Sequence, residues 1–159
     1  MNLGWAFGPE VSVLAAELKD GVGQVSARGH GERTCPGCGT CATARHSWQH
    51  RRLQDLPVHG ARVTLNLHLG RWRCRNPDCE RQTFSERLMA IAAPLARRTC
   101  RVAELVRLLG HIAGGRPGER LMARLGMPAS DSTILRQLKR YAAGRALAPV
   151  RVLGIDDWS

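Results

Sequence analysis

Hydrophobic and polar residues alternate most regularly in RVTLNLHL, residues 62–69. The valine and the three leucines fall on one face and the polar residues on the other, which is typical of a half-buried strand. Two shorter apolar runs within residues 11–28 flank the dipeptide Asp20-Gly21, which favours a tight turn between strands. The pattern therefore predicts an antiparallel hairpin followed, further along, by a separate strand.

The period then changes from that of a strand to that of an α-helix. In RVAELVRLLGHI, residues 101–112, apolar residues recur at helical spacing. A second helix is expected over residues 117–125, and a third over residues 131–143, DSTILRQLKRYAA. The sequence RVLGID, residues 151–156, predicts a short terminal strand. The expected fold class is α+β, with a small β-rich module followed by three helices and that strand.

The charge of the chain changes this picture by suggesting a partner. The net charge is +11, and 22 of the 24 basic residues are arginine, which binds phosphate and base edges in bidentate fashion. Residues 30–81 carry +5 and residues 82–149 carry +8. We expect a nucleic-acid partner; the alternative is that the arginines only keep the chain soluble.

Two features bear on the cellular location. The N-terminal sequence lacks the basic region of a signal peptide. The longest apolar run, residues 89–96, is far shorter than the roughly 20 residues that span a bilayer. We expect a cytoplasmic, nucleoid-associated protein with no membrane partner. In that compartment cysteines are expected to bind metal and not to form disulfides.

The cysteines form two pairs with the spacing of metal ligands. Cys35 and Cys38 form C-x2-C in CPGCG, and Cys74 and Cys79 form C-x4-C in RCRNPDCE. A proline favours a tight turn within each pair. Two such turns brought together make a tetrahedral four-sulfur site, so we expect these four residues to hold structural zinc in a zinc-ribbon-like module.

Other ligand sets stay open at this point. His46 and His50 would complete a two-cysteine, two-histidine finger with Cys35 and Cys38, but only seven residues lie between the second cysteine and the first histidine, where about twelve are expected. CPGCGTC also opens like an iron–sulfur pattern, but Arg45 stands where the fourth cysteine is needed.

The remaining cysteines and the nearby aromatic residues are expected to be structural. Cys41 is interpreted as a neighbour of the site, and Cys100 as a small buried apolar residue. Trp72 and Phe84 flank the second cysteine pair and are expected to pack against it.

The last two helices and the turn between them match a helix-turn-helix, in which the second helix enters the major groove of DNA. Small and polar residues occupy the turn in LGMPASDST, and a basic face follows it. The residues expected to contact DNA are Ser132, Thr133, Arg136, Gln137 and Arg140. The alternative is a plain three-helix bundle with a solvated polar face.

The ordered series CPGCG, RRLQDLP, RWRCRNPDCERQTFSERL, RLGMPASDSTILRQL and GIDDWS resembles the ISL-three family of bacterial insertion-sequence transposases over residues 30–159. In that family a zinc finger and a helix-turn-helix precede a ribonuclease-H-like domain of DDE type. The resemblance implies zinc on the same four cysteines, and Asp156 as the first catalytic carboxylate. In a complete enzyme, three such carboxylates would hold magnesium.

The expected domains are an N-terminal hairpin (1–29), the zinc module (30–85), the helical DNA-binding module (86–148) and the first strand of an incomplete catalytic domain (149–159). The sequence ends before the second and third acidic residues, so we expect this truncated chain alone neither to cleave nor to join DNA. Removal of zinc by a chelator is expected to unfold the zinc module.

The expected function is that of the DNA-binding N-terminal portion of a DDE transposase, which recognises the inverted repeats at transposon ends. The alternative is a stand-alone zinc-ribbon, helix-turn-helix regulator; a redox enzyme would instead require iron. Double-stranded DNA is the expected partner, with a second copy of the chain or the full-length transposase as the expected protein partner.

Overall fold

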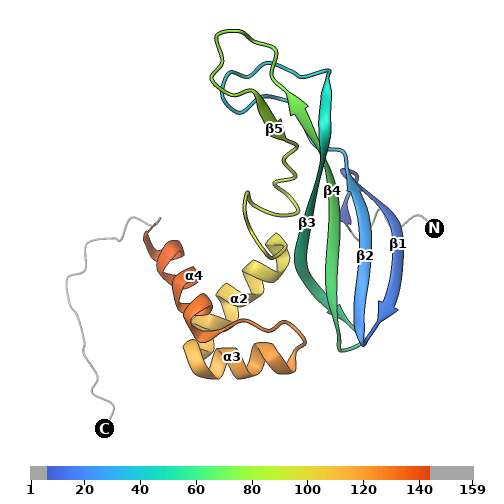
Figure 1. Cartoon of the computed structure of the whole chain (residues 1–159). Helices are drawn as coiled ribbons and strands as arrows, with labels where there is room; N and C mark the ends of the chain where they lie inside the picture. The colour runs from blue at the N-terminus through green and yellow to red at the C-terminus, as the bar shows by residue number, and fades with distance from the viewer. Residues whose placement is uncertain (1–6, 144–159) are drawn as a thin grey trace, which may run out of the picture.

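The computed structural model describes residues 7–143 of the 159-residue chain. A twisted β-sheet lies beside a group of three helices (Figure 1). The elements in chain order are β1 (Val11–Lys19), β2 (Val22–Gly29), β3 (Arg45–Val58), β4 (Ala61–Arg73), β5 (Thr83–Ser85), α2 (Cys100–Ala113), α3 (Gly115–Arg124) and α4 (Asp131–Ala143). This architecture confirms the α+β class. The strand predicted at residues 151–156 lies outside the described residues.

One sheet contains both the N-terminal hairpin and the strands of the zinc module. Its strand order is β1-β2-β4-β3, and β5 pairs with the end of β4. β2 runs parallel to β4, with Val22 opposite Arg62 and Arg28 opposite His68, whereas the other neighbours are antiparallel. The sheet therefore crosses the domain boundary expected at residue 29. The division of the chain into four domains stays a prediction.

Both long hairpins close on a residue pair in the left-handed region. Asp20 and Gly21 have φ angles of 51° and 72°, and His59 and Gly60 have 49° and 76°. Two successive positive φ angles are typical of the turns whose twist matches that of the flanking strands. The first hairpin was predicted. The second, which joins β3 to β4, was not, because β3 lacks an alternating pattern.

One face of β4 forms the main core. The alternation predicted for residues 62–69 is confirmed, since Val63, Leu65, Leu67 and Leu69 are all buried. A segment that follows β5 crosses this face and contributes part of the core (Figure 1). Further buried members of the core are Val11, Ala27, Leu53, Leu88, Ile91 and Ala92. Each fully buried leucine stabilises the fold by about 1.5–3 kcal/mol.

The three predicted helices are all present and enclose a second core. Its buried residues are Val102, Val106, Met122, Met127, Ala129 and Ile134. α2 and α4 approach closely at Gly110, where an added Cβ would lie 2.6 Å from Ile134 Cγ2. α3 begins at Gly115, so Pro117 lies in its first turn, where a missing N–H breaks no helical hydrogen bond. No helix within residues 7–143 is long and apolar enough to cross a membrane.

A polar junction holds the helices to β3. The buried Asp55 carboxylate accepts hydrogen bonds from Thr99 Oγ1 at 2.8 Å and from Arg101 Nε at 2.7 Å. The backbone of Gln54 pairs on both sides, with the carbonyl of Arg97 at 2.9 Å and the N–H of Thr99 at 3.0 Å. The chain thus enters α2 as a short extension of the sheet edge, which fixes where the helices begin.

Candidate zinc centre and nucleic-acid interface

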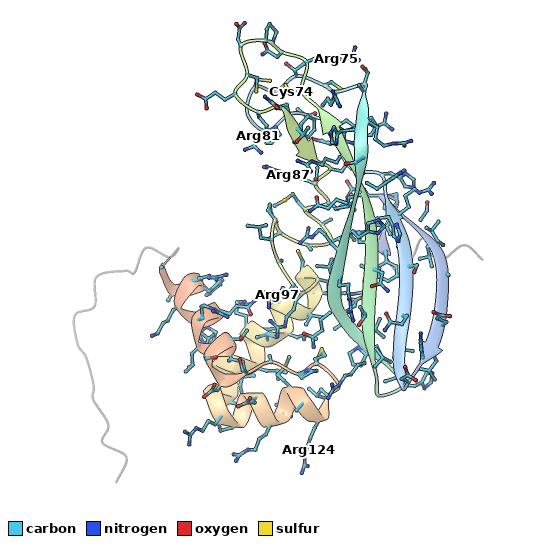
Figure 2. The ribbon with its side chains drawn as sticks, viewed as in Figure 1. Cys74, Arg75, Arg81, Arg87, Arg97 and Arg124 are labelled. Atoms are coloured by element: carbon cyan, nitrogen blue, oxygen red, sulfur yellow. The ribbon has the colours of Figure 1, made fainter. Side chains whose placement is uncertain are left out.

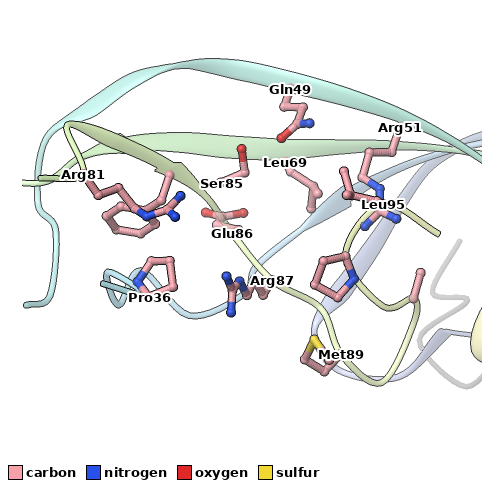
Figure 3. Close-up of a pocket in the computed structure, with 13 residues that line it drawn as sticks. Pro36, Gln49, Arg51, Leu69, Arg81, Ser85, Glu86, Arg87, Met89 and Leu95 are labelled. Carbon is pink, nitrogen blue, oxygen red and sulfur yellow. The ribbon is translucent and has the colours of Figure 1, made fainter. Parts of the chain in front are cut away.

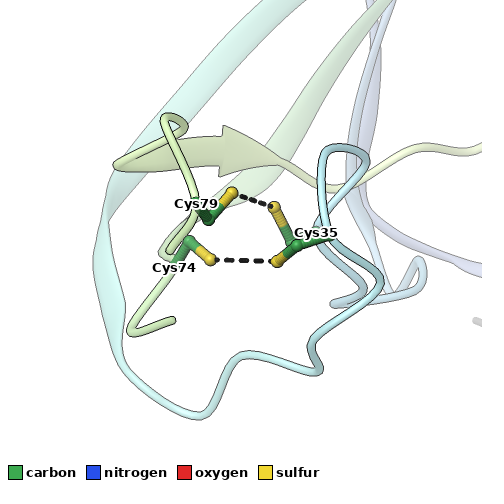
Figure 4. A group of neighbouring side chains, drawn as sticks. Cys35, Cys74 and Cys79 are labelled. Atoms are coloured by element: carbon green, nitrogen blue, oxygen red, sulfur yellow. Dashed lines mark hydrogen bonds between the residues drawn. The ribbon is translucent and has the colours of Figure 1, made fainter. Parts of the chain in front are cut away.

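The four predicted zinc ligands meet at one end of the sheet. Cys35 and Cys38 lie in the loop before β3, and Cys74 and Cys79 lie in the loop between β4 and β5. The sulfur atoms of all four lie within 4.8 Å of one another. Cys35 Sγ is 3.9 Å from Cys79 Sγ, and Cys38 Sγ is 3.5 Å from Cys74 Sγ (Figure 4). A tetrahedral zinc with bonds of about 2.3 Å separates its sulfurs by about 3.8 Å, so the spacing fits that ion.

Local turns aim these cysteines at one point. The Cys35 carbonyl accepts a hydrogen bond from the N–H of Gly39, whose φ of 73° reverses the chain. In the second loop, Asn76 Oδ1 accepts a hydrogen bond from the N–H of Asp78 at 3.0 Å, and the Asn76 carbonyl accepts one from the N–H of Cys79 at 3.2 Å. Each loop is therefore a compact turn that is closed by its own backbone.

A small core supports the cysteines, as predicted for Trp72 and Phe84. Both aromatic residues are buried together with Cys35. Trp72 Nε1 donates to Glu86 Oε1 at 3.0 Å, and the other oxygen of Glu86 accepts the N–H of Gly70 at 3.1 Å. The buried carboxylate is thus fully hydrogen-bonded, which fixes the indole under the cysteine loops.

The four neighbouring thiols have opposite shifts in pKa. Hydrogen bonds with the Thr40 hydroxyl and backbone lower the pKa of Cys38 to about 6. The backbone of Asn76 lowers the pKa of Cys74, but burial and the three neighbouring cysteines outweigh that effect and raise it to about 12. The thiols therefore cannot all ionise by themselves. A bound divalent metal removes this repulsion and deprotonates its ligands.

The segment that contains the four cysteines resembles a known family. Residues 24–79 match the family described as the zinc-finger of transposase IS204/IS1001/IS1096/IS1165. This match supports a transposase-type zinc ribbon. No curated protein and no solved structure matches the chain significantly. The matched segment runs from β2 to Cys79 and contains both cysteine pairs, so the cofactor of the zinc ribbon is structural zinc.

The structure also decides between the other metal-binding alternatives. His46 and His50 lie on β3, outside the cysteine cluster, so the two-cysteine, two-histidine finger is wrong. Cys41 is exposed and lies outside the cluster, as expected of a neighbour. Cys100 is also exposed, which corrects the expectation that it is buried: it begins α2, and its Sγ donates to the Met89 carbonyl at 3.4 Å.

Most of the predicted DNA-contact residues line one hollow, the basic groove. It has a volume of about 560 Å³ and lies between α4 and the segment before α2. Its lining residues are Gln54, Leu95, Ala96, Arg97, Arg98, Ala103, Thr133, Arg136, Gln137 and Arg140. Ser132, the other predicted contact, is exposed but does not line it. Sequence reasoning missed Gln54, Arg97 and Arg98, since only the fold brings them beside α4.

Four of the five predicted side chains already make hydrogen bonds, and among them Arg136 Nη2 donates to Thr133 Oγ1 at 3.4 Å. Gln137 Nε2 donates to the Ala103 carbonyl of α2 at 3.1 Å, and Thr133 Oγ1 accepts a hydrogen bond from Ser130 Oγ at 2.9 Å. Arg136 and Arg140 are both exposed and both line the basic groove. These two arginines are therefore the better placed of the five predicted residues to reach a ligand.

The basic groove gathers positive charge without a carboxylate in its lining. The ion pairs recorded among residues 7–143, Asp55–Arg101 and Glu104–Arg107, both lie outside it. Burial, and then the charge of Arg136, lower the pKa of Arg98, whose Nε is held by Gln54 Oε1 at 2.8 Å. The groove is therefore a site of concentrated positive potential that favours an anionic ligand.

The sheet face opposite the core carries a second basic surface. Trp48 lies there on β3, with the guanidinium of Arg45 4.5 Å and that of Arg28 5.3 Å from its ring centroid. The rings of His50 and His68 lie edge to face at 4.2 Å. Because side chains alternate across a strand, these residues point away from the leucines of the core.

Further arginines lie between the zinc ribbon and the helices. Arg81, Arg87 and Arg97 lie on the same side of β3, between the cysteine loops and the helices (Figure 2). Asp156, the expected catalytic carboxylate, lies outside the described residues.

Proposed function

We propose that this chain is the DNA-binding N-terminal portion of a DDE transposase and that it recognises the inverted repeats at transposon ends. The basic groove carries this proposal, because four arginines from two distant parts of the chain line it and no carboxylate does. The match of residues 24–79 to a transposase zinc finger supports it independently.

In this proposal α3 and α4 form a helix-turn-helix, with α4 in the major groove. Ser130 caps the N-terminus of α4, since its side chain accepts the N–H of Thr133 at 3.4 Å and its carbonyl accepts the N–H of Ile134 at 3.0 Å. Residues 125–130, between the helices, are longer than the three- or four-residue turn of the simplest motif. α2 packs behind both helices, and its contact with Gln137 orients α4.

The arginines take two different roles. Arg136 and Arg140 are carried by α4 and are proposed to read base edges, where a bidentate contact with guanine discriminates between bases. Arg97 and Arg98 come from the segment before α2 and are proposed to bind the phosphate backbone beside the major groove, which positions the protein without reading sequence. The zinc ribbon supports the end of the sheet from which this segment leaves.

The test compares three variants of the zinc-loaded full chain. The DNA probes are duplexes with the inverted repeats that flank its own gene and shuffled duplexes of equal length. Arg136→Ala should reduce the preference for the repeats by about 1–3 kcal/mol, whereas Arg97→Ala should weaken binding to both duplexes and flatten the salt slope by about one unit. Arg124→Ala is the matched control, because Arg124 is the last residue of α3 and does not line the basic groove (Figure 2).

The outcomes separate the candidate functions. Equal binding of wild-type protein to all duplexes would contradict sequence recognition, and an absence of binding to any duplex would contradict the DNA partner itself. A preference for an unrelated promoter over the repeats would favour the stand-alone regulator.

A further inference from the structure

Leu95 combines two features that folding alone does not explain. Its side chain is 96% exposed, and its φ angle is 60°, in the left-handed region that favours glycine. The other two non-glycine residues with positive φ among residues 7–143, Asp20 and His59, belong to hairpin turns that require this geometry. Leu95 therefore has an unfavourable backbone and no burial to offset it, which points to a function.

The turn that carries Leu95 is rigidly held. The N–H of Ala96 donates to the Ala93 carbonyl at 3.1 Å, so Pro94 and Leu95 are the central residues of a β-turn whose second central position normally takes glycine. The guanidinium of Arg51, on β3, donates to the carbonyls of Ala93 and Ala96 at 3.0 and 2.8 Å. The sheet thus fixes the turn from below, and the leucine projects from a pre-organised support.

Arginines flank Leu95 on both sides. It lines the basic groove and also a second hollow of about 260 Å³ toward the zinc ribbon (Figure 3). That second hollow is lined by Arg51, Arg81 and Arg87 together with apolar residues, Gln49 and Ser85. Its Glu86 is already hydrogen-bonded to Trp72 and Gly70. Leu95 therefore stands between two groups of guanidinium ions, and Met89, which is 57% exposed, lines the second hollow beside it.

We propose that Leu95 enters the minor groove of the bound duplex, between its two phosphate backbones. One backbone lies in the basic groove, which separates Leu95 from α4, and the other lies in the second hollow. The duplex then presents its major groove to α4 and the adjacent minor groove to Leu95. An apolar side chain inserted there partly unstacks a base step and bends the DNA, while flanking arginines bind the phosphates. This proposal rests on the proposed function.

An acidic protein is the competing partner for the same surface. The observations favour DNA because Leu95 and Met89 are the large exposed apolar side chains that line the two hollows and arginines lie on both sides of Leu95, whereas a protein interface has a broader apolar core inside a polar rim. In the minor groove of DNA two rows of phosphates flank a narrow opening, which matches the two groups of arginines that flank Leu95.

The test uses the zinc-loaded full chain with Leu95 replaced by Gly and, separately, by Asn, which also tolerates positive φ. Leu18→Ala is the control, since Leu18 is 72% exposed on β1, at the opposite edge of the sheet from β3. We expect the melting temperature of both Leu95 variants to stay at or above the wild-type value. We expect their affinity for mixed-sequence duplexes to fall by about fivefold or more. The end-to-end distance of a doubly labelled duplex, shortened by wild-type protein, should return toward that of free DNA.

A minor-groove-binding drug should compete with wild-type protein but much less with the Leu95 variants. Wild-type affinity and duplex bending in both Leu95 variants would overturn the minor-groove role while leaving DNA binding intact. Tighter binding to polyglutamate than to duplex would overturn it in favour of an acidic protein. Failure of wild-type protein to bind any duplex would instead overturn the proposed function itself.

Discussion

At the scale of single residues, the four zinc-ribbon cysteines are distinguished from the other two by position alone. Cys35, Cys38, Cys74 and Cys79 converge from two loops, whereas Cys41 is only three residues from Cys38 and yet lies outside the cluster. The spacing of the four was readable from the sequence because the turns are local. The exposure of Cys100 was not, since it depends on which side of α2 the sheet covers.

Replacement of Cys38 by Ser should abolish zinc binding, and Cys41→Ser should retain one zinc per chain, because only the former lies in the four-sulfur cluster. Zinc loss should unfold a shorter stretch than the residues 30–85 expected from the sequence. The leucines of β4 belong to a separate core and do not touch the cysteines. Amide exchange should therefore speed up in residues 33–44 and 73–85 while the middle of β4 stays protected.

Metal content measured by atomic absorption, together with hydrogen exchange, provides this check. Zinc retention in Cys38→Ser would contradict the ligand set, and loss of protection throughout β4 would contradict a local role for the metal.

At the scale of elements, β3 and its junction with α2 organise the molecule. The sequence did not predict β3, because β3 is an edge strand. Of its 14 residues only Leu53 and Asp55 are buried. A hydrophobic pattern requires a buried face, and most of this strand has none. The helices, by contrast, each bury one stripe and could be predicted from their period.

Removal of Arg101 should destabilise the fold by about 3 kcal/mol, because it leaves the Asp55 carboxylate buried with only Thr99 as a recorded side-chain donor. Asp55→Ala should be milder, since the Arg101 side chain is 42% exposed and can be hydrated. Glu104→Ala is the control for a surface pair and should stay below about 1 kcal/mol. Urea unfolding measures all three. Equal effects of Arg101→Ala and Glu104→Ala would show that the junction does not anchor α2.

At the scale of the whole molecule, contacts between distant parts of the chain bring together arginines that no local sequence pattern connects. The sequence indicated the basic face of α4, but the return of residues 86–99 across the sheet and the bridge of Arg98 with Gln54 on β3 determine what lies opposite that face. Arg97, Arg98 and Leu95 belong to this returning segment, and their position beside α4 emerges only in the fold. The proposed DNA surface is thus assembled from the zinc ribbon, the returning segment and the helices.

Hydroxyl-radical footprinting of the zinc-loaded full chain on the DNA that flanks its own gene tests the central claim most directly. The method reports sugars shielded along the minor groove and therefore maps the bound segment base by base. We predict protection on both strands within the inverted repeats, at a protein concentration that leaves a shuffled duplex unprotected. Uniform protection of both duplexes, or protection of neither, would contradict the account.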